Sequence, residues 1–499
     1  MQRHGHDWLS TWTEPLLLVL FAVAVRLPGF PASVLAWDES MLILMAHAML
    51  HGQLPYVVIF DDKSLGEPAL LAAGMAVLGE SVVAVRLLAT LAVGATGLVL
   101  RSIALRAGMS RGAALASGLL YAAFSTSLDG LSAMPEIVLA PFTTGAAAIA
   151  VAHLDTAAAP RQLRAVAAMG LACGVAIWIK SVAVPPACML FVLLVGGWLL
   201  RRRTGVVWAL ALAATYAVTC LLPTALTGLY YVWRGQWDAF WYCNFGFMPG
   251  FLGHKPGWPV ILRMTADHLL DLWPLLVLAG FAVVLRRAAP ALVIAMLLWL
   301  AAEFVAAVAP LKFFGHYFLL LLPPLCVLSA LTLDVLARRT MLAERRSVAP
   351  AIVALCVALV PLTVVARLLI ASDLDIRQPD KLRQAASLIR NDATPGATLW
   401  VVNENPIINF LADVPSPTRF MFPQHLVGDL SGMTGIDPAT EVQRVLSERP
   451  RYIVVAADAW VLVEPALRPL IHAAIDSDYQ LTWQVPRWPM PLEIYKLRN

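Results

Sequence analysis

Two adjacent carboxylates, Asp38 and Glu39, come shortly after the first apolar stretch of the chain. Lys63 lies further along the same hydrophilic segment, directly after two more carboxylates, Asp61 and Asp62. Ionisable groups beside a bilayer are costly to keep out of water, and they usually mark a functional site. A carboxylate can accept a proton there and a lysine can hold an anion. The spacing therefore predicts a catalytic loop that acts on an anionic ligand.

The composition indicates whether the chain is soluble or lies in a membrane. Hydrophobic residues make up 60% of the chain and charged residues only 14%, and the mean hydropathy is +0.74. These values exclude an ordinary soluble domain and predict a polytopic α-helical membrane protein. The formal net charge of +4 over 499 residues is small, and the arginines fall in short clusters between apolar stretches. A nucleic-acid partner is therefore not expected.

About 20 apolar residues are needed to cross a bilayer as a helix. On that measure the sequence predicts about eleven spans, with 11 to 13 possible, near 14–30, 82–105, 112–128, 136–153, 164–179, 182–200, 205–228, 266–285, 289–309, 314–336 and 348–370. The stretch Pro68 to Gly79 is too short for a span and suits an interfacial or re-entrant helix. Glu39 to His51 is expected to form a juxtamembrane helix, and the first apolar run is expected to stay as an anchor.

Arginine distribution predicts the orientation. Basic clusters occur on alternate loops, which should face the cytoplasm. They comprise Arg106 and Arg111, Arg161 and Arg164, Arg201 to Arg203, Arg286 and Arg287, and Arg338, Arg339, Arg345 and Arg346. Successive loops alternate between the two sides of the membrane. The parts expected outside are therefore the Asp38 loop, Glu136, the 229–265 loop, Lys312 and the C-terminal segment.

The composition changes near Asp373 to that of a soluble domain. We expect a transmembrane domain over 1–372, with a catalytic external loop at 31–81, and an extracytoplasmic α/β domain over 373–499. Helices are predicted at Asp380 to Arg390, from the cap Asp437-Pro438 to Ser447, and from about Pro465 to Ile475. Strands are predicted at Thr398 to Val402, Tyr452 to Ala456, Leu481 to Val485 and Leu492 to Tyr495.

Several short strings together resemble a known family. They are Trp37-Asp38-Glu39, Ala46-His47-Ala48, Gly52 with Pro55-Tyr56, Phe60-Asp61-Asp62-Lys63, Tyr230 to Gly235, Lys312 to Tyr317 with Leu321 to Pro324, and Ile494-Tyr495. This set is similar to the membrane glycosyltransferases of GT-C fold, specifically the protein O-mannosyltransferase and lipid A aminoarabinose transferase family. The likeness covers nearly the whole chain in layout, and the first loop and His316-Tyr317 are its specific parts.

The resemblance implies transfer of a sugar from a polyprenyl-phosphate donor to an acceptor on the external face of a bacterial inner membrane. The acceptor would be a protein, lipid A or another envelope glycan. The family's second acidic position, on the next external loop, corresponds to Glu136, with Asp129 close enough to compete. The sugar itself is left open.

Glycosyl transfer needs a base for the acceptor hydroxyl and cations for the departing lipid phosphate. Asp38 suits the base, and Glu39 could raise its pKa or bind a metal. Lys63, Lys312 and His316 are the natural phosphate ligands, with Arg234 a weaker candidate. Further candidate binding residues are Tyr56, Asp61, Asp62, Glu67 and Tyr317. The carboxylates Asp38, Glu39, Asp61, Asp62 and Glu67 could hold a divalent cation, but their spacing is not diagnostic.

Each assignment has a structural alternative. Asp38 and Glu39 could simply cap the juxtamembrane helix, and Lys63 and Lys312 could be interface lysines whose stems lie along apolar surface. A transporter or flippase that binds a lipid phosphate without chemistry is the alternative function. Transporters bind near the bilayer midplane, whereas these candidates gather at one external rim, which favours the enzyme.

Overall fold

The computed structural model describes residues 7–253, 256–285, 289–342, 380–487 and 489–498, with short stretches between 353 and 366. Contacts divide the chain into two compact units. Unit 1 comprises Met1–Gly29, Arg86–Leu229 and Lys255–Ser372, and unit 2 comprises Phe30–Val85, Tyr230–His254 and Asp373–Asn499. Unit 2 thus joins two segments from the first half of the chain to the C-terminal segment. The division into a transmembrane domain over 1–372 and an extracytoplasmic domain over 373–499 stays a prediction.

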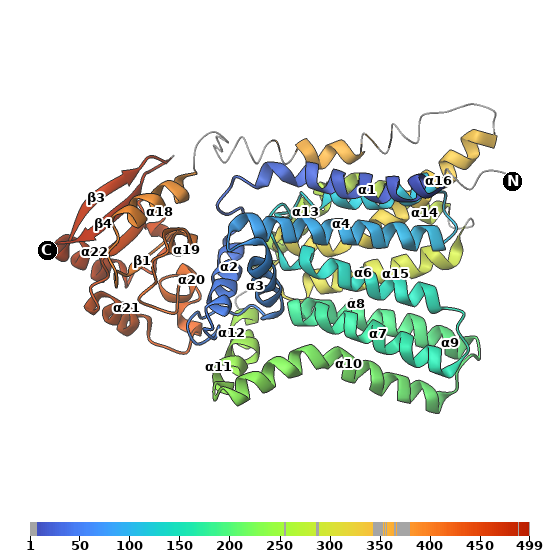
Figure 1. The fold of residues 1–499 in the computed structure, drawn as a ribbon, viewed down its shortest axis with the longest axis horizontal. Coiled ribbons are helices and arrows are strands. Elements are labelled where there is room, and N and C mark those ends of the chain that lie inside the picture. The colour runs from blue at the N-terminus through green and yellow to red at the C-terminus, as the bar shows by residue number, and fades with distance from the viewer. Residues whose placement is uncertain are drawn as a thin grey trace. The chain divides into compact units, whose positions relative to one another are not determined.

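Unit 1 is built from helices, and several of its long helices run alongside one another (Figure 1). Their bounds are α1 (Asp7–Arg26), α4 (Val82–Arg106), α5 (Arg111–Phe124), α6 (Pro135–His153), α7 (Ala159–Ile179), α8 (Val184–Phe191), α9 (Gly197–Leu200), α10 (Val206–Trp233), α13 (Trp258–Asp271), α14 (Trp273–Val284), α15 (Pro290–Val308) and α16 (Leu322–Leu342).

Eight stretches of the described chain are helical, long and apolar enough to cross a membrane, and the bent pair α13 and α14 would make a ninth. They confirm the predicted polytopic helical fold and match nine of the eleven predicted spans. The predicted span 112–128 corresponds to α5, which has only 14 residues. The predicted span 348–370 lies mostly outside the described residues. The short stretch after Pro68 is helix α3 (Gly66–Leu78).

Burial separates the inner helices of unit 1 from the outer ones. In the most apolar 18-residue window of Gly315–Arg339, a span that includes most of α16, 89% of the residues are buried, whereas in the corresponding window of Val206–Trp233 only 17% are. The exposed side chains of α10 are largely apolar, so this helix presents a surface suited to lipid. α7 approaches α10 closely through Gly174, where a Cβ atom would lie 2.6 Å from the Cys220 carbonyl oxygen. Small residues allow such close packing between membrane helices.

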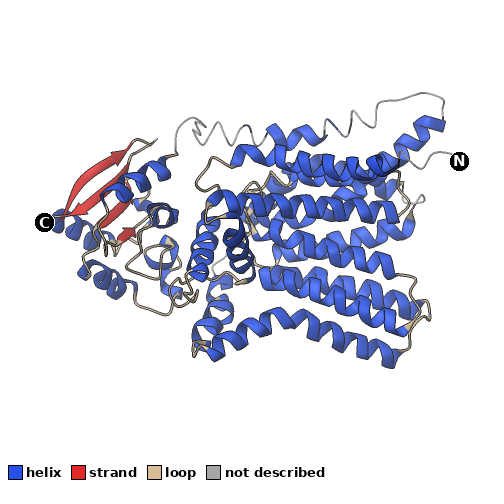
Figure 2. Ribbon diagram, viewed as in Figure 1, coloured by secondary structure: helices blue, strands red, loops and turns tan. Residues whose placement is uncertain are grey.

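The strands found among the described residues belong to unit 2 (Figure 2) and form one four-stranded sheet of order β1-β2-β4-β3. Its strands are β1 (Leu399–Val401), β2 (Tyr452–Ala456), β3 (Tyr479–Val485) and β4 (Leu492–Leu497). β1 and β2 are parallel and the other pairs are antiparallel. Every residue of β1 and β2 is buried, as expected for strands covered on both faces.

Unit 2 also contains short helices besides α3. They are α2 (Trp37–Leu50), α11 (Trp237–Trp241), α12 (Met248–Gly253), α18 (Lys381–Asp392), α19 (Ile407–Ala412), α20 (Pro423–Leu426), α21 (Pro438–Ser447) and α22 (Arg468–Asp478). α18 and α21 begin at acidic caps, where Asp380 and Asp437 accept hydrogen bonds from the amides of Arg383 and Thr440. The elements predicted from 380 onward therefore match those in the structure within a few residues.

One hydrophobic core joins the three segments of unit 2. Met41 and Met45 of α2, Phe240 and Cys243 of the middle segment, and Phe420, Val442 and Ile453 of the C-terminal segment belong to the same buried cluster. Segments that share a core must lie on the same side of the membrane. Between residues 85 and 230 the chain has five candidate spans, but a return to the same side needs an even number of crossings. We infer that α5 crosses as well, despite its length.

An even number of crossings between residues 85 and 230 predicts that all parts of unit 2 lie on one side of the membrane. Reporter fusions after Asn499 and after residue 80, both in unit 2, should give the same signal, and the arginine distribution makes that signal external. A fusion after Ala157, in the turn between α6 and α7, should give the opposite signal. Paired alkaline phosphatase and fluorescent-protein fusions measure each side of the membrane independently. Opposite signals from the two unit 2 fusions would contradict the shared core.

Candidate active site

The two adjacent carboxylates at the start of α2 have different surroundings. Ala36 is extended, and α2 begins at Trp37, where the Ser40 hydroxyl donates to the Trp37 carbonyl. Glu39 is fully buried and reaches back, so that its Oε2 accepts from the Leu35 amide at 3.1 Å. Asp38 keeps 30% of its side chain exposed and faces Lys63. The capping alternative therefore describes the observed contact of Glu39 but not the Asp38–Lys63 contact.

Lys63 gathers three of the predicted site residues. Its Nζ lies 3.1 Å from Asp61 Oδ1, 3.4 Å from Asp38 Oδ1 and 3.8 Å from Asp62 Oδ1. We call these four residues the Lys63 cluster. Asp38 comes from α2, and the other three come from the loop before α3. A lysine that only snorkelled at the interface would not need three acidic partners.

Tyr56 fixes the loop that carries Lys63. Its buried hydroxyl donates to the Lys63 carbonyl at 2.6 Å and lies 3.4 Å from Oδ1 of Asn244 in the middle segment. The Tyr56 backbone has a positive φ of 67°, which is uncommon for a residue other than glycine. The hydrogen bond that the Tyr56 amide donates to the Ile59 carbonyl stabilises this conformation. Tyr56 is thus a positioning residue for the Lys63 cluster.

The Lys63 cluster contains one basic and three acidic groups. Burial alone would favour the neutral amine, but Asp38, Asp61 and Asp62 together raise the pKa of Lys63 well above its usual value, so it stays an ammonium. Burial raises the pKa of Asp61 to about 7, with Lys63 opposing this rise and Asp62 adding to it. Asp61 therefore changes charge near neutral pH, and the net charge around Lys63 changes with it.

An aromatic wall that the sequence did not single out lies beside the Lys63 cluster. Lys63 Nζ lies 5.4 Å from the centre of the Phe422 ring, and Trp37 packs edge-on against that ring. His425 is buried against Phe422 and Phe60, and burial lowers its pKa to about 4. His425 is thus neutral at physiological pH. Trp37 and Phe60 adjoin residues of the cluster in sequence, whereas Phe422 and His425 lie far from it, so no local spacing could have indicated these two.

Glu136 and Lys180 form a second polar site, within unit 1. Pro135 begins α6 after the extended Met134, which places Glu136 in the first turn. Its buried carboxylate lies 2.6 Å from Nζ of Lys180, the residue after α7. The ammonium also lies 4.1 Å from the centre of the Tyr317 ring. Lys180 is therefore held by both Glu136 and Tyr317.

The predicted segment Lys312 to Tyr317 also belongs to unit 1. Lys312 and His316 are both largely buried, and the His316 ring packs edge-on against Tyr317 at 4.7 Å. The backbone turns sharply here, with positive φ at Leu311 and Phe313. Asp129, the competitor of Glu136, is exposed, and its Oδ2 lies 3.5 Å from where a Gly315 Cβ would be. Unit 1 thus offers two acidic candidates near Tyr317 and Gly315.

Other predicted residues have separate surroundings. The exposed guanidinium of Arg234 contacts the Tyr230 hydroxyl at 2.7 Å, and in the described chain it makes no contact with the Lys63 cluster. Glu67 is fully buried in the first turn of α3. Since Lys63 belongs to unit 2 and Lys312 and His316 to unit 1, a shared phosphate site remains a prediction.

Comparison with known proteins shows the fold. No protein-family model and no curated protein sequence matches this chain. Among solved structures it resembles ArnT from Cupriavidus metallidurans bound to undecaprenyl phosphate, with 17% identity, a TM-score of 0.64 and coverage of 96% of this chain and 97% of that one. The same protein in the apo state gives 16% identity and a TM-score of 0.64, with 98% of each chain covered.

An oligosaccharyltransferase from Archaeoglobus fulgidus, in complex with Zn and sulfate, is more distant, with 12% identity and a TM-score of 0.50 over 89% of this chain and 67% of that one. The likeness to ArnT extends over 96–98% of this chain. The chain is thus a multi-pass membrane protein with the GT-C glycosyltransferase fold.

Proposed function

We propose that this protein moves a sugar from a polyprenyl-phosphate carrier to an acceptor hydroxyl on the external face of a bacterial inner membrane. The observation that carries the proposal is the Asp38–Lys63 pair, in which a partly exposed carboxylate at the start of the helix after the first span lies 3.4 Å from the half-buried ammonium of Lys63. The full-length likeness to a structure that binds undecaprenyl phosphate supports a lipid-phosphate donor. The C-terminal segment is external in this proposal.

The proposed reaction is a single displacement that inverts the anomeric carbon. The acceptor oxygen attacks that carbon while its proton passes to Asp38, and the bond from the sugar to the phosphate oxygen breaks. The electron pair stays on the phosphate, which leaves as polyprenyl phosphate. Lys63 would stabilise the charge that develops on this leaving group.

The Lys63 cluster limits how the phosphate can bind. With all three carboxylates ionised, the cluster carries two net negative charges and repels an anion. The protonated form of Asp61 removes one of them, and a phosphate oxygen could take the place of an aspartate oxygen on Nζ. A metal shared by Asp38, Asp61 and Asp62 would have to displace Lys63, because the ammonium lies among those carboxylates. The acceptor would be a protein, lipid A or another envelope glycan.

Asp38→Asn tests the base. The amide keeps the shape of the carboxylate and loses its basicity, so we expect transfer to fall by 100-fold or more, in line with the roughly 10²–10⁴-fold contribution of general base catalysis. The assay incubates purified protein with labelled polyprenyl-phosphate sugar and acceptor membranes from a deletion strain, and measures released polyprenyl phosphate and labelled acceptor.

Asp238→Asn is the matched control, because Asp238 is exposed in the middle segment of unit 2. It should keep wild-type turnover. Normal turnover by Asp38→Asn would remove Asp38 from the base role and point to Glu136 or Asp129. Donor binding without release of lipid phosphate by the wild type would favour the transporter instead.

Replacing Lys63 and Lys312 tests whether the two units hold one phosphate. A charge-assisted hydrogen bond contributes about 1.5–3 kcal/mol, so Lys63→Met and Lys312→Met should each weaken donor affinity about tenfold or more. If both lysines contact one anion, the effects of the two changes should not add. Equilibrium binding of labelled donor gives the four affinities of the cycle.

Lys63→Met also leaves buried carboxylates without their cation, so its folding must be checked separately. The double variant Asp61→Asn with Lys63→Met removes the fully buried partner as well and should fold more stably than Lys63→Met alone. Lys496→Met is the control, since Lys496 pairs with Asp392 at 2.6 Å elsewhere in unit 2. Unchanged donor affinity in folded Lys63→Met and Lys312→Met would return both lysines to a structural role.

The raised pKa of Asp61 predicts a pH dependence of donor binding. Below a pH of about 7 Asp61 is protonated and neutral, and above it the site gains a negative charge. A further like charge near the phosphate costs about 1 kcal/mol or more, so affinity should fall about fivefold or more as the pH rises through 7. Sugar-linked donor is the ligand to use, because its phosphodiester keeps one charge throughout.

Asp61→Asn should abolish this dependence, because an amide does not titrate. Asp392→Asn removes an aspartate that pairs with Lys496 and should leave the dependence unchanged. An affinity that rises with pH, or a slope that persists in Asp61→Asn, would contradict the role given to Asp61.

A further inference from the structure

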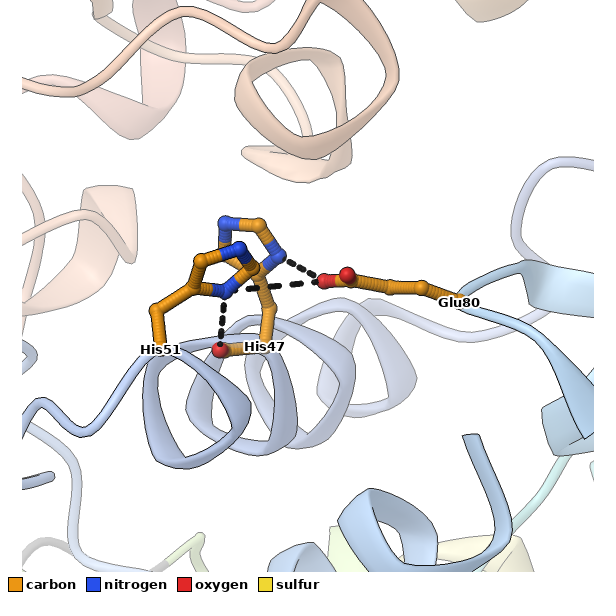
Figure 3. A group of neighbouring side chains, drawn as sticks. All are labelled: His47, His51 and Glu80. Carbon is orange, nitrogen blue, oxygen red and sulfur yellow. Dashed lines mark hydrogen bonds and ion pairs between the residues drawn. The ribbon is translucent and has the colours of Figure 1, made fainter. Parts of the chain in front are cut away.

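Three metal-ligand side chains meet at the C-terminal end of α2 (Figure 3): His47, His51 and Glu80. His47 lies in the last turn of α2, and His51 follows the helix one turn later. Glu80 follows Gly79, which ends α3 with a φ of 93° and turns the chain toward α4. All three residues belong to unit 2, in its first segment.

The three side chains converge on one carboxylate oxygen. Nδ1 of His47 contacts Oε1 of Glu80, and Nδ1 of His51 lies 3.8 Å from the same oxygen. One ligand atom from each residue lies within 4.8 Å of the other two. Ligands about 2.0–2.2 Å from a tetrahedral centre lie roughly 3.4 Å apart. Small side-chain rotations would therefore bring all three to coordination distance.

A simple His47–Glu80 hydrogen bond does not explain the whole arrangement. The ring of His51, whose Nδ1 is directed toward the His47 carbonyl oxygen, also faces the Glu80 carboxylate, with its centre 4.4 Å from that of His47. Two imidazoles spaced i, i+4 along a helix face the same side, which is a common way to bind a transition metal. His51 Nδ1 also lies 3.0 Å from the His47 carbonyl oxygen, and metal binding through that nitrogen would replace this contact.

We propose that His47, His51 and Glu80 bind a divalent transition metal of the zinc class, with water completing its coordination. Two histidines and a glutamate suit such an ion better than calcium or magnesium, which prefer oxygen ligands. The side chains are between 31% and 53% exposed, so a metal can reach them from solvent. One side of the site is apolar, because Phe410 packs edge-on against His47 at 5.5 Å.

The metal would tie the end of α2 to the turn between α3 and α4. Asp38 lies nine residues before His47 on the same helix, roughly 14 Å away at 1.5 Å per residue. The metal is therefore too distant to act on a substrate held at Asp38, and it would stabilise the helix that positions Asp38. The proposal does not depend on sugar transfer.

Metal titration of the full-length protein tests the site directly. The protein is purified without a polyhistidine tag, treated with chelator and titrated with Co²⁺ while visible absorption is recorded. We expect one equivalent of Co²⁺ to bind with the intense absorption of a four-coordinate site, and Zn²⁺ to displace it. His51→Ala and Glu80→Gln should each weaken this binding by at least 10–100-fold, which is the cost of losing even an outer-shell partner.

His472→Ala is the matched control, because His472 is exposed in unit 2 and packs against Trp460, outside the cluster. It should bind Co²⁺ as the wild type does. Glu80→Gln keeps the size of the side chain, so it tests the site even if His47→Ala fails to fold. The proposal would be overturned by no saturable binding of Co²⁺, or by binding that survives both His51→Ala and Glu80→Gln, as a metal at the Lys63 cluster would.

Discussion

The enclosure of a half-buried lysine by three carboxylates is the constraint on which the proposed site depends. A lone ammonium in this position would be strongly penalised by the loss of water, and so would the fully buried Asp61. Each group is tolerated because the other is there, and removing one partner of such a pair usually costs more than the pair contributes. Lys63 thereby ties the start of α2 to the loop before α3, and it holds Asp38 in place.

The same dependence extends through the rest of unit 2. The Lys63 carbonyl is held by Tyr56, Tyr56 lies against Tyr231 of the middle segment, and the Tyr231 hydroxyl donates back to the Pro55 carbonyl. Phe60, three residues before Lys63, donates its amide to the Arg419 carbonyl. The loop that carries the candidate chemistry is therefore shaped by segments that the membrane spans separate from it in sequence.

This arrangement has a consequence for folding. Ser33, near the start of the first segment of unit 2, donates both its amide and its hydroxyl to Asp380, 347 residues later. Unit 2 cannot complete its core until the spans between these residues have been made. Contacts of such long sequence separation are slow to form because the intervening chain must first be ordered. The spans thus determine when the candidate site can assemble, as well as where.

The sequence indicated most elements of the fold because their signals are local. Most of the apolar stretches and the caps Asp380 and Asp437 depend on neighbouring residues only, and they correspond to elements of the structure. The acidic loop and its lysine could also be singled out, because charges are rare in this chain. Their pairing could not, because Asp38 and Lys63 meet only after the loop has folded back on α2.

Other features depend on tertiary packing and left no local signal. His425 and Phe422 have ordinary surroundings in sequence, and they lie beside Phe60 and Lys63 only because unit 2 joins distant segments. Glu136 and Asp129 could be named as competitors, but the Lys180 partner of Glu136 comes from the end of another helix. The different environments of Asp38 and Glu39 likewise depend on the extended backbone before α2, which brings the Leu35 amide to Glu39.

The most direct measurement is an experimental structure of the protein in lipid nanodiscs with undecaprenyl phosphate bound. We predict a phosphate oxygen about 3 Å from Lys63 Nζ, with at least one aspartate contact of Lys63 given up. A phosphate bound elsewhere, with Lys63 still enclosed by Asp38, Asp61 and Asp62, would contradict it.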